Sequence, residues 1–285
     1  MTERKTIVVT GAGGYVGPHV VTAILDRGHD VLAVLRPGAD APMDPRARTV
    51  YADILAEDFD PRVFGTIPDA IVHLAWKDGF THNSPAHMEQ LSAHFRLLTN
   101  LSARGVGRIV ALGTMHEIGY WEGAITDSTP TNPLSQYGIA KDALRRALPL
   151  ALGDASRLAW VRCYYIYGDD RRNRSIFARI LESVDEGKTG FPFTTGKNKY
   201  DFIRVEELGR QIAAVTDADE IVGVVNGSSG VPVSLAEKVE EFISENQLPI
   251  ALEYGAFPDR PYDSPGVWGD ATVVQDLMRR DSESQ

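Results

Sequence analysis

The stretch TIVVTGAGGYVG, residues 6–17, joins a short apolar run to a helical pattern through a Gly-x-x-Gly-x-x-Gly spacing. Gly11 permits a tight turn, Gly14 lets a pyrophosphate approach the backbone, and Gly17 lets the helix pack against the strand. The helix that follows begins with unsatisfied N–H groups, and its dipole favours an anion there. The stretch therefore predicts a dinucleotide-binding turn between the first strand and the first helix.

The chain around this turn alternates apolar runs with helical patterns, which is typical of a parallel sheet covered by helices on both faces. Strands are predicted at residues 6–10, 31–35, 49–52, 70–75, 108–113, 158–164 and 223–226. Helices are predicted from the turn to about residue 27, and at residues 85–104 and 135–151. We therefore expect an α/β fold, a doubly wound parallel sheet of the Rossmann type.

Turn-rich segments interrupt this alternation beyond residue 165. We expect the dinucleotide-binding domain to comprise residues 1–165 together with about 205–228. Residues 166–204 and 229–285 are expected to form a small, discontinuous C-terminal subdomain that binds substrate.

Composition excludes several classes of protein. The 285 residues include 39 acidic and 29 basic side chains, a net charge of -10, which argues against a nucleic-acid partner. Cys163 is the single cysteine, so no intrachain disulfide forms and a reducing compartment suits the chain. The polar start is unlike a signal peptide, and no apolar run is long enough for a membrane span. We expect a cytoplasmic protein with neither a membrane contact nor a metal site.

A tyrosine and a lysine stand four residues apart in the motif YGIAK, residues 137–141. On a helix this spacing puts Tyr137 and Lys141 on one face, one turn apart. Hydride addition to a ketone creates an alkoxide, which needs a proton donor close by. The ordinary pKa of tyrosine is near 10, and a neighbouring ammonium is expected to favour the ionised phenol. Thr114, at the end of a predicted strand, adds a hydroxyl that can orient the reacting oxygen.

These motifs together resemble the extended short-chain dehydrogenase/reductase family, which includes NAD-dependent epimerases and dehydratases. The resemblance implies that Thr114, Tyr137 and Lys141 are catalytic and that Lys141 also holds the nicotinamide ribose. It further implies a set of cofactor contacts: Gly11, Gly13, Gly14, Tyr15, Val16, Gly17, Arg36, Asp53, Ile54, Leu74, Ala75, Trp76, Tyr137, Lys141 and Tyr164.

Three of these residues keep a second interpretation. Asp53 is expected to meet the adenine, although an Asp at this point is also a common helix N-cap. Tyr164 either packs beside the nicotinamide or fills the core. Arg36 follows the second strand where an acid would bind the adenosine 2′-hydroxyl, so it is expected to pair with a 2′-phosphate, although a solvated surface arginine is the other interpretation. NADP(H) is therefore the preferred cofactor, with NAD(H) possible.

The residues after Thr114 bear on the substrate. Sugar 4,6-dehydratases of the family carry Asp-Glu there, and this chain carries Met115-His116, which argues against dehydration. The run TMHEIGYWEG, residues 114–123, resembles ketoreductases of the dTDP-6-deoxy-L-talose 4-dehydrogenase type. The resemblance implies an NADP(H)-dependent reduction at C4 of a nucleotide-linked 4-keto-6-deoxyhexose, and dTDP is the expected nucleotide.

Two alternatives stay open, a nucleotide-sugar 4-epimerase and a non-catalytic NADP(H)-sensing protein. The substrate contacts expected from the sequence are Thr114, Met115, His116, Arg174 and Arg260. The two arginines are suited to a diphosphate. The family resemblance also implies a homodimer formed through the helices at residues 85–104 and 135–151.

Overall fold

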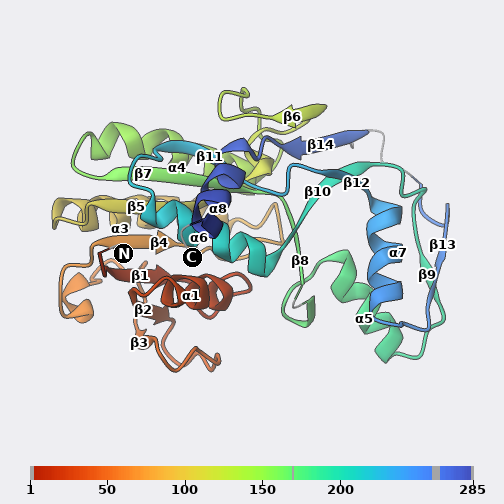
Figure 1. Ribbon diagram of the computed structural model, residues 1–285, viewed down its shortest axis with the longest axis horizontal. Helices are drawn as coiled ribbons and strands as arrows, with labels where there is room; N and C mark the ends of the chain where they lie inside the picture. Colours follow the sequence, from red (N-terminus) through yellow and green to blue (C-terminus); the bar gives the residue numbers. More distant parts are fainter. Residues whose placement is uncertain (1–2, 169, 259–263, 284–285) are drawn as a thin grey trace.

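The structure is a computed structural model that describes residues 3–168, 170–258 and 264–283. Its main sheet has seven strands in the order β11-β7-β5-β4-β1-β2-β3, and all neighbouring pairs are parallel (Figure 1). The order reverses between β1 and β4, and ligands bind at the carboxyl ends of the strands at such a point. The doubly wound α/β fold predicted from the sequence is confirmed.

The seven strands of this sheet lie within two residues of the predicted ranges. Its strands are β1 (Thr6–Thr10), β2 (Asp30–Leu35), β3 (Arg48–Tyr51), β4 (Ala70–His73), β5 (Arg108–Thr114), β7 (Arg157–Cys163) and β11 (Gly223–Gly227). Its helices are α1 (Gly17–Asp26), α2 (Ala86–Glu89), α3 (Leu91–Ala103), α4 (Gln136–Leu152), α6 (Val205–Asp217) and α8 (Thr272–Glu283). Within the described parts of the chain, no helix is both long and apolar enough to cross a membrane.

The alternation of side chains along β1 explains the two helical layers. Ile7 and Val9 lie in the core that also contains buried residues of α1, α6 and α8. Val8 points to the other face, where its core is completed by α3 and α4. Both faces of the strand are apolar because both are covered.

One predicted helix is divided in the structure. The range 85–104 forms α2 and α3, which meet at Gln90 with φ -95° and ψ -5°. The Gln90 carbonyl still accepts hydrogen bonds from the N–H groups of Ala93 and His94, at 3.0 and 3.1 Å. The break is therefore a local change of backbone angle, which the helical periodicity does not reveal.

A second lobe lies beside the main sheet, to the right in Figure 1. Its sheet has the order β12-β10-β14-β6, with β8 also paired to β10. Its elements are β6 (Gly123–Ile125), β8 (Tyr165–Tyr167), α5 (Ile176–Asp185), β9 (Gly190–Pro192), β10 (Lys199–Arg204), β12 (Pro232–Ser234), α7 (Leu235–Glu245), β13 (Ala251–Glu253) and β14 (Gly266–Gly269). Phe177, Phe202 and Phe242 pack together in its core.

The C-terminal helix packs in a different domain from the one expected from the sequence. The range 229–285 was expected to belong to the substrate-binding subdomain. The structure instead places α8 against α6 and β11, beside the main sheet (Figure 1). Val274 and Leu277 of α8 are buried in the same core as Ile7.

Candidate active site

The glycine turn has the close contacts that a dinucleotide site requires. Gly11 has φ +70°, and a Cβ atom there would lie 2.7 Å from the Ala75 nitrogen. A Cβ atom at Gly17 would lie 2.5 Å from the Ala12 carbonyl carbon. Helix α1 begins after Val16 with no side chain capping its first N–H groups. The turn and the uncapped helix therefore fit the pyrophosphate of a nicotinamide dinucleotide.

The second lobe reaches this turn through the loop after β8. The Tyr15 hydroxyl donates to the Gly168 carbonyl at 2.6 Å. The Arg172 guanidinium donates to the Gly13 carbonyl at 3.3 Å. The glycine turn is thus held between the main sheet and the lobe expected to bind substrate.

The residues expected near the adenosine follow β2 and β3. Arg36 is exposed directly after β2. Asp53 Oδ1 accepts a hydrogen bond from the Leu55 N–H at 3.2 Å within a turn, and no helix begins at Asp53, so the helix N-cap considered from the sequence is not formed. Ile54 is buried in the core beneath α3, and Leu74 packs against the core on the other face of the sheet.

Helix α4 presents Tyr137 and Lys141, and its N-terminus is fully anchored. Ser135 caps it by accepting a hydrogen bond from the Gly138 N–H at 3.2 Å. The Tyr137 N–H donates to the His82 carbonyl at 2.9 Å, and the Gln136 N–H donates to Asn83 Oδ1 at 3.2 Å. The loop after β4 therefore fixes the turn of helix that carries the phenol.

Gly138 brings Thr114 to this helix. The short helix η2 (Met115–Glu117) follows Thr114 at the end of β5. A Cβ atom at Gly138 would overlap the His116 carbonyl group, at 3.0 Å from its carbon. Only a glycine lets η2 approach so closely, and the Thr114 side chain then lies near enough to the phenol to lower the pKa of Tyr137.

The electrostatics of the pair differ from the expectation. Burial raises the pKa of Tyr137 above its ordinary value, while the hydrogen bond from Thr114 opposes the rise. Burial lowers the pKa of Lys141 to about 8. The Lys141 ammonium donates to the Leu112 carbonyl at 2.6 Å and lies 3.9 Å from the Trp76 ring centroid. Burial therefore has the largest effect on the pKa of Tyr137, and the phenol is protonated near neutral pH.

Two histidines border the phenol. The His82 and His116 rings are 4.2 Å apart, and they lie 5.6 and 6.0 Å from the Tyr137 ring. Burial lowers the pKa of His116 to about 4 and also lowers the pKa of His82. Both are neutral hydrogen-bonding groups above pH 7, which suits contacts to sugar hydroxyls.

His73, interpreted from the sequence as structural, lies in a buried chain of hydrogen bonds. Its Nδ1 is 2.8 Å from Thr10 Oγ1, and its Nε2 is 2.9 Å from His94 Nδ1. His94 stacks on Trp76 with ring centroids 4.3 Å apart. These hydrogen-bonded side chains support the Trp76 ring, over which the Lys141 ammonium lies.

Several predicted contacts lie elsewhere. Tyr164 donates to Asn226 Oδ1 at 3.0 Å and packs in a small core with Met115, so it takes the core-filling role considered for it. Met115 is buried in that core. Arg174 is exposed on the loop before α5. Arg260 lies outside the described residues.

Comparison with known proteins identifies the family. Residues 7–226 match the model of the NAD dependent epimerase/dehydratase family. The chain belongs to this family. It is accordingly an oxidoreductase of the CH–OH group that uses a nicotinamide dinucleotide, as the sequence motifs predicted.

Individual relatives extend this result. The chain is 41% identical to dTDP-6-deoxy-L-talose 4-dehydrogenase (NAD(+)) of Aggregatibacter actinomycetemcomitans, over 92% of this chain and 98% of the relative. It shares its fold with UDP-N-acetylglucosamine 4-epimerase of Methanobrevibacter ruminantium M1, with TM-score 0.82, 18% identity, and 96% and 92% of the two chains covered. A Bordetella bronchiseptica enzyme, WbmH, in complex with NAD+ gives TM-score 0.76, 23% identity, and 96% and 91% coverage.

The structure adds residues that the sequence reasoning did not assign to the site. Gly138 stands inside a predicted helix, where glycine costs about 1 kcal/mol relative to alanine, and this is a signal of close approach. Glu117 follows Thr114 by three residues, the spacing of a capping box. Asn83 lies in a loop and carries no comparable signal.

Proposed function

We propose that this protein is an NADP(H)-dependent ketoreductase that acts at C4 of a dTDP-4-keto-6-deoxyhexose. The chemistry is supported by one observation above all, the meeting of Thr114, Tyr137 and Lys141 beside the glycine turn. The substrate class is supported by the 41% identity to a dTDP-6-deoxy-L-talose 4-dehydrogenase over nearly the whole chain. That relative's reaction and the proposed one are the two directions of redox chemistry at C4.

A nicotinamide dinucleotide held at the glycine turn would supply the hydride that adds to C4. Tyr137 donates its proton to the oxygen that becomes the C4 hydroxyl, so the ketone gains one hydride and one proton. Thr114 hydrogen-bonds the same oxygen and orients it. Lys141 supplies positive charge behind the phenol and, as in the family, holds the nicotinamide ribose. Burial raises the pKa of Tyr137, so the phenol carries a proton to donate near neutral pH.

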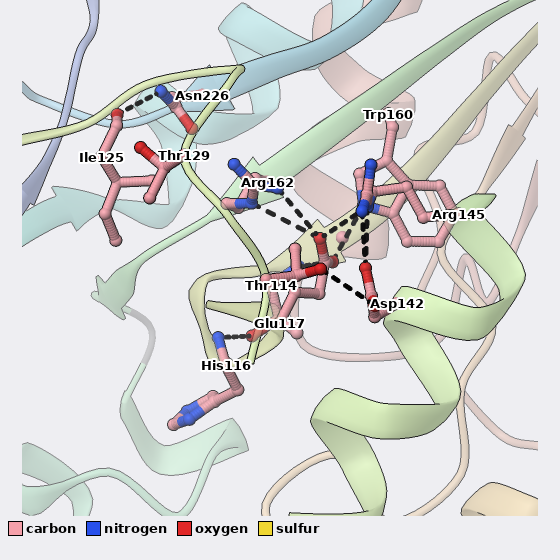
Figure 2. A network of polar contacts seen from close by, with 12 residues as sticks. Thr114, His116, Glu117, Ile125, Thr129, Asp142, Arg145, Trp160, Arg162 and Asn226 are labelled. Atoms are coloured by element: carbon pink, nitrogen blue, oxygen red, sulfur yellow. Dashed lines mark hydrogen bonds and ion pairs between the residues drawn. The ribbon is translucent and has the colours of Figure 1, made fainter. Parts of the chain in front are cut away.

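Dehydration is a poor fit to the same site. Elimination of water across C5 and C6 needs an acid and a base beside the catalytic threonine. Met115 is buried in the core, and His116 is the neighbouring side chain that faces Tyr137. The Glu117 carboxylate is bonded within a buried network that includes Trp160 and Arg162 (Figure 2).

The cofactor preference rests on Arg36. It is exposed at the end of β2, where a guanidinium can pair with a 2′-phosphate. Arg36→Asp should reduce kcat/KM for NADPH by about 10-fold or more, with a smaller effect on NADH, because the phosphate loses a charge-assisted partner. An unchanged ratio of the two cofactors would refute the preference.

We further propose a cytoplasmic homodimer. The lone Cys163 suits a reducing compartment. Helix α4 exposes Ile139 and Leu150, the latter by 89%, on one of the two helices expected to pair. Analytical ultracentrifugation that finds only monomer would refute the dimer.

The function is tested by mixing enzyme, NADPH and dTDP-4-keto-6-deoxyglucose, with and without a 3,5-epimerase, and following oxidation of the nicotinamide. We expect stoichiometric consumption of NADPH in at least one mixture. A 4-epimerase would instead retain its cofactor and show no net oxidation. Binding of NADPH without turnover in either mixture would refute the proposal.

A further inference from the structure

A buried carboxylate lies directly behind the catalytic threonine. Glu117 closes a capping box with Thr114: the Thr114 N–H donates to Glu117 Oε1 at 2.8 Å, and the His116 N–H donates to Thr114 Oγ1 at 3.3 Å. The indole N–H of Trp160 donates to the same carboxylate oxygen at 2.8 Å. Glu117 therefore holds the backbone of the residue whose hydroxyl meets Tyr137.

The other carboxylate oxygen faces two arginines (Figure 2). Arg162 of β7 approaches Glu117 Oε2 with Nε at 3.4 Å and a terminal nitrogen at 3.3 Å, and both side chains are 0% exposed. Arg145 of α4 lies 3.6 Å from the same oxygen and also binds Asp142. All of these partners donate, so both oxygens of Glu117 act as acceptors, as in a carboxylate.

Burying the Glu117 carboxylate and its arginine partners has a cost in folding free energy, which a functional role would explain. Desolvating an ion pair costs several kcal/mol per ion, and apolar side chains of similar volume fill such space at lower cost. The surrounding chain also makes room for it, because a Cβ atom at Gly113 would lie 2.8 Å from Glu117 Oε1 and 2.7 Å from Trp160 Cδ1. The local sequence is therefore built around the carboxylate.

The charge of Glu117 also reaches the reacting groups. It adds to the rise that burial causes in the pKa of Tyr137, and it opposes the larger fall that burial causes in the pKa of Lys141. Lys141 is on the same helix as the phenol, and Cys163 faces it from β7. The remaining titratable groups around the Tyr137 ring are His82, His87 and His116.

We propose that Glu117 is a positioning residue for the redox reaction: its buried carboxylate fixes the backbone of Thr114 and balances the guanidinium of Arg162 behind the catalytic helix. Thr114 and Tyr137 then meet in one geometry, and no uncompensated cation lies behind the phenol. The kinetic test of this role rests on the proposed ketoreductase function.

Three variants separate position from charge. Glu117→Gln keeps the shape, removes the charge and leaves Arg162 unbalanced. It should lower kcat by about 10- to 100-fold, with KM for NADPH within about twofold, because Thr114 loses a charged acceptor. It should also move the high-pH limb of kcat/KM to lower pH by about half a unit or more, because Lys141, whose pKa is about 8, loses the carboxylate charge that raises that pKa.

The other two variants isolate each effect. Glu117→Asp keeps the charge but not the reach, so kcat should fall while the pH limb stays in place. The double variant Glu117→Gln with Arg162→Gln removes both charges, so the pH limb should return toward that of the wild type while kcat stays low. These two variants carry the test if Glu117→Gln alone does not fold.

A matched control is available in the second lobe. Ser234 and Glu237 form the same capping box at the start of α7, where Glu237 accepts from the Ser234 N–H at 3.1 Å in an exposed setting. Glu237→Gln should leave kcat and the pH profile unchanged. Wild-type kcat and pH profile in Glu117→Gln would overturn the proposal, and so would a fall in kcat with an unmoved pH limb.

The single cysteine gives a readout that needs no sugar substrate. Burial raises the pKa of the Cys163 thiol to about 12, and Glu117 adds to that rise. Glu117→Gln should therefore speed alkylation of Cys163 at a fixed pH several-fold, whereas Glu117→Asp and Glu237→Gln should not. If the wild type fails to reduce a dTDP-4-keto sugar, only the proposed function falls. Equal alkylation rates in all variants would overturn the role of Glu117.

Discussion

Replacing Gly138 by alanine tests how closely the catalytic helix must approach Thr114. The new Cβ atom would lie 3.0 Å from both the His116 carbonyl carbon and Pro133 Cβ, and nearer still to the carbonyl oxygen. Carbon atoms pack best at about 3.5–4.0 Å, so η2 must retreat from α4 by roughly 0.5–1 Å. The Thr114 hydroxyl moves with it, away from Tyr137.

A displacement of about 1 Å at a reacting group can lower the rate about 100-fold. We therefore expect kcat of Gly138→Ala to fall by about 10- to 100-fold. Stability should change less, because alanine gains about 1 kcal/mol of helix propensity against the cost of the clash.

The assay is NADPH oxidation with saturating dTDP-4-keto-6-deoxyhexose, accompanied by cofactor titration and thermal unfolding. Gly107→Ala is the matched control, because a Cβ atom at Gly107 meets no atom within 4 Å. It should retain the kcat of the wild type. A folded Gly138→Ala variant with wild-type kcat would show that this close approach does not place Thr114.

Three further outcomes follow from the structure. Tyr137→Phe should abolish reduction while leaving cofactor affinity within about twofold, measured by turnover and fluorescence titration, since only the proton donor is removed. Lys141→Met should be inactive yet more stable near neutral pH by up to about 3 kcal/mol, because burial lowers the lysine pKa from 10.5 to about 8. Below pH 8 the wild-type folded state is destabilised because it buries a charged amine. The difference in the free energy of unfolding between the variant and the wild type should therefore vanish as pH rises toward 10.5. Asp201→Ala should destabilise the protein by about 3 kcal/mol or more, measured by chemical denaturation, because this fully buried carboxylate accepts hydrogen bonds from the turn at residues 229–230 and from Gly269.

The main sheet could be predicted because its strands are apolar on both faces and its helices are periodic. The chemistry could be predicted because both motifs that indicate it are local in the sequence. One is the Gly-x-x-Gly-x-x-Gly spacing, and the other is the pair Tyr137 and Lys141, four residues apart. The position of α8 could not be predicted in this way. The apolar face that contains Val274 and Leu277 shows that the helix packs, but not which sheet it packs on.

The directions of the side chains after β5 also could not be predicted from the sequence. The chain leaves the strand at Thr114 and enters one turn of 3-10 helix, so neighbouring side chains diverge. Met115 enters the core while His116 faces Tyr137. The sequence led us to expect an ionised phenol favoured by the ammonium, whereas burial raises the pKa of Tyr137 in the structure. Burial depends on the packing of α4 and η2, which no local pattern specifies.

The central claim is that hydride from the nicotinamide adds at C4 while Tyr137 supplies the proton. The most direct measurement uses NADPH deuterated at the transferable position with a dTDP-4-keto-6-deoxyhexose, and locates the label by NMR. The account predicts one deuterium at C4 of the product with the wild type and none with Tyr137→Phe. A product without deuterium at C4, or equal labelling by Tyr137→Phe, would contradict it.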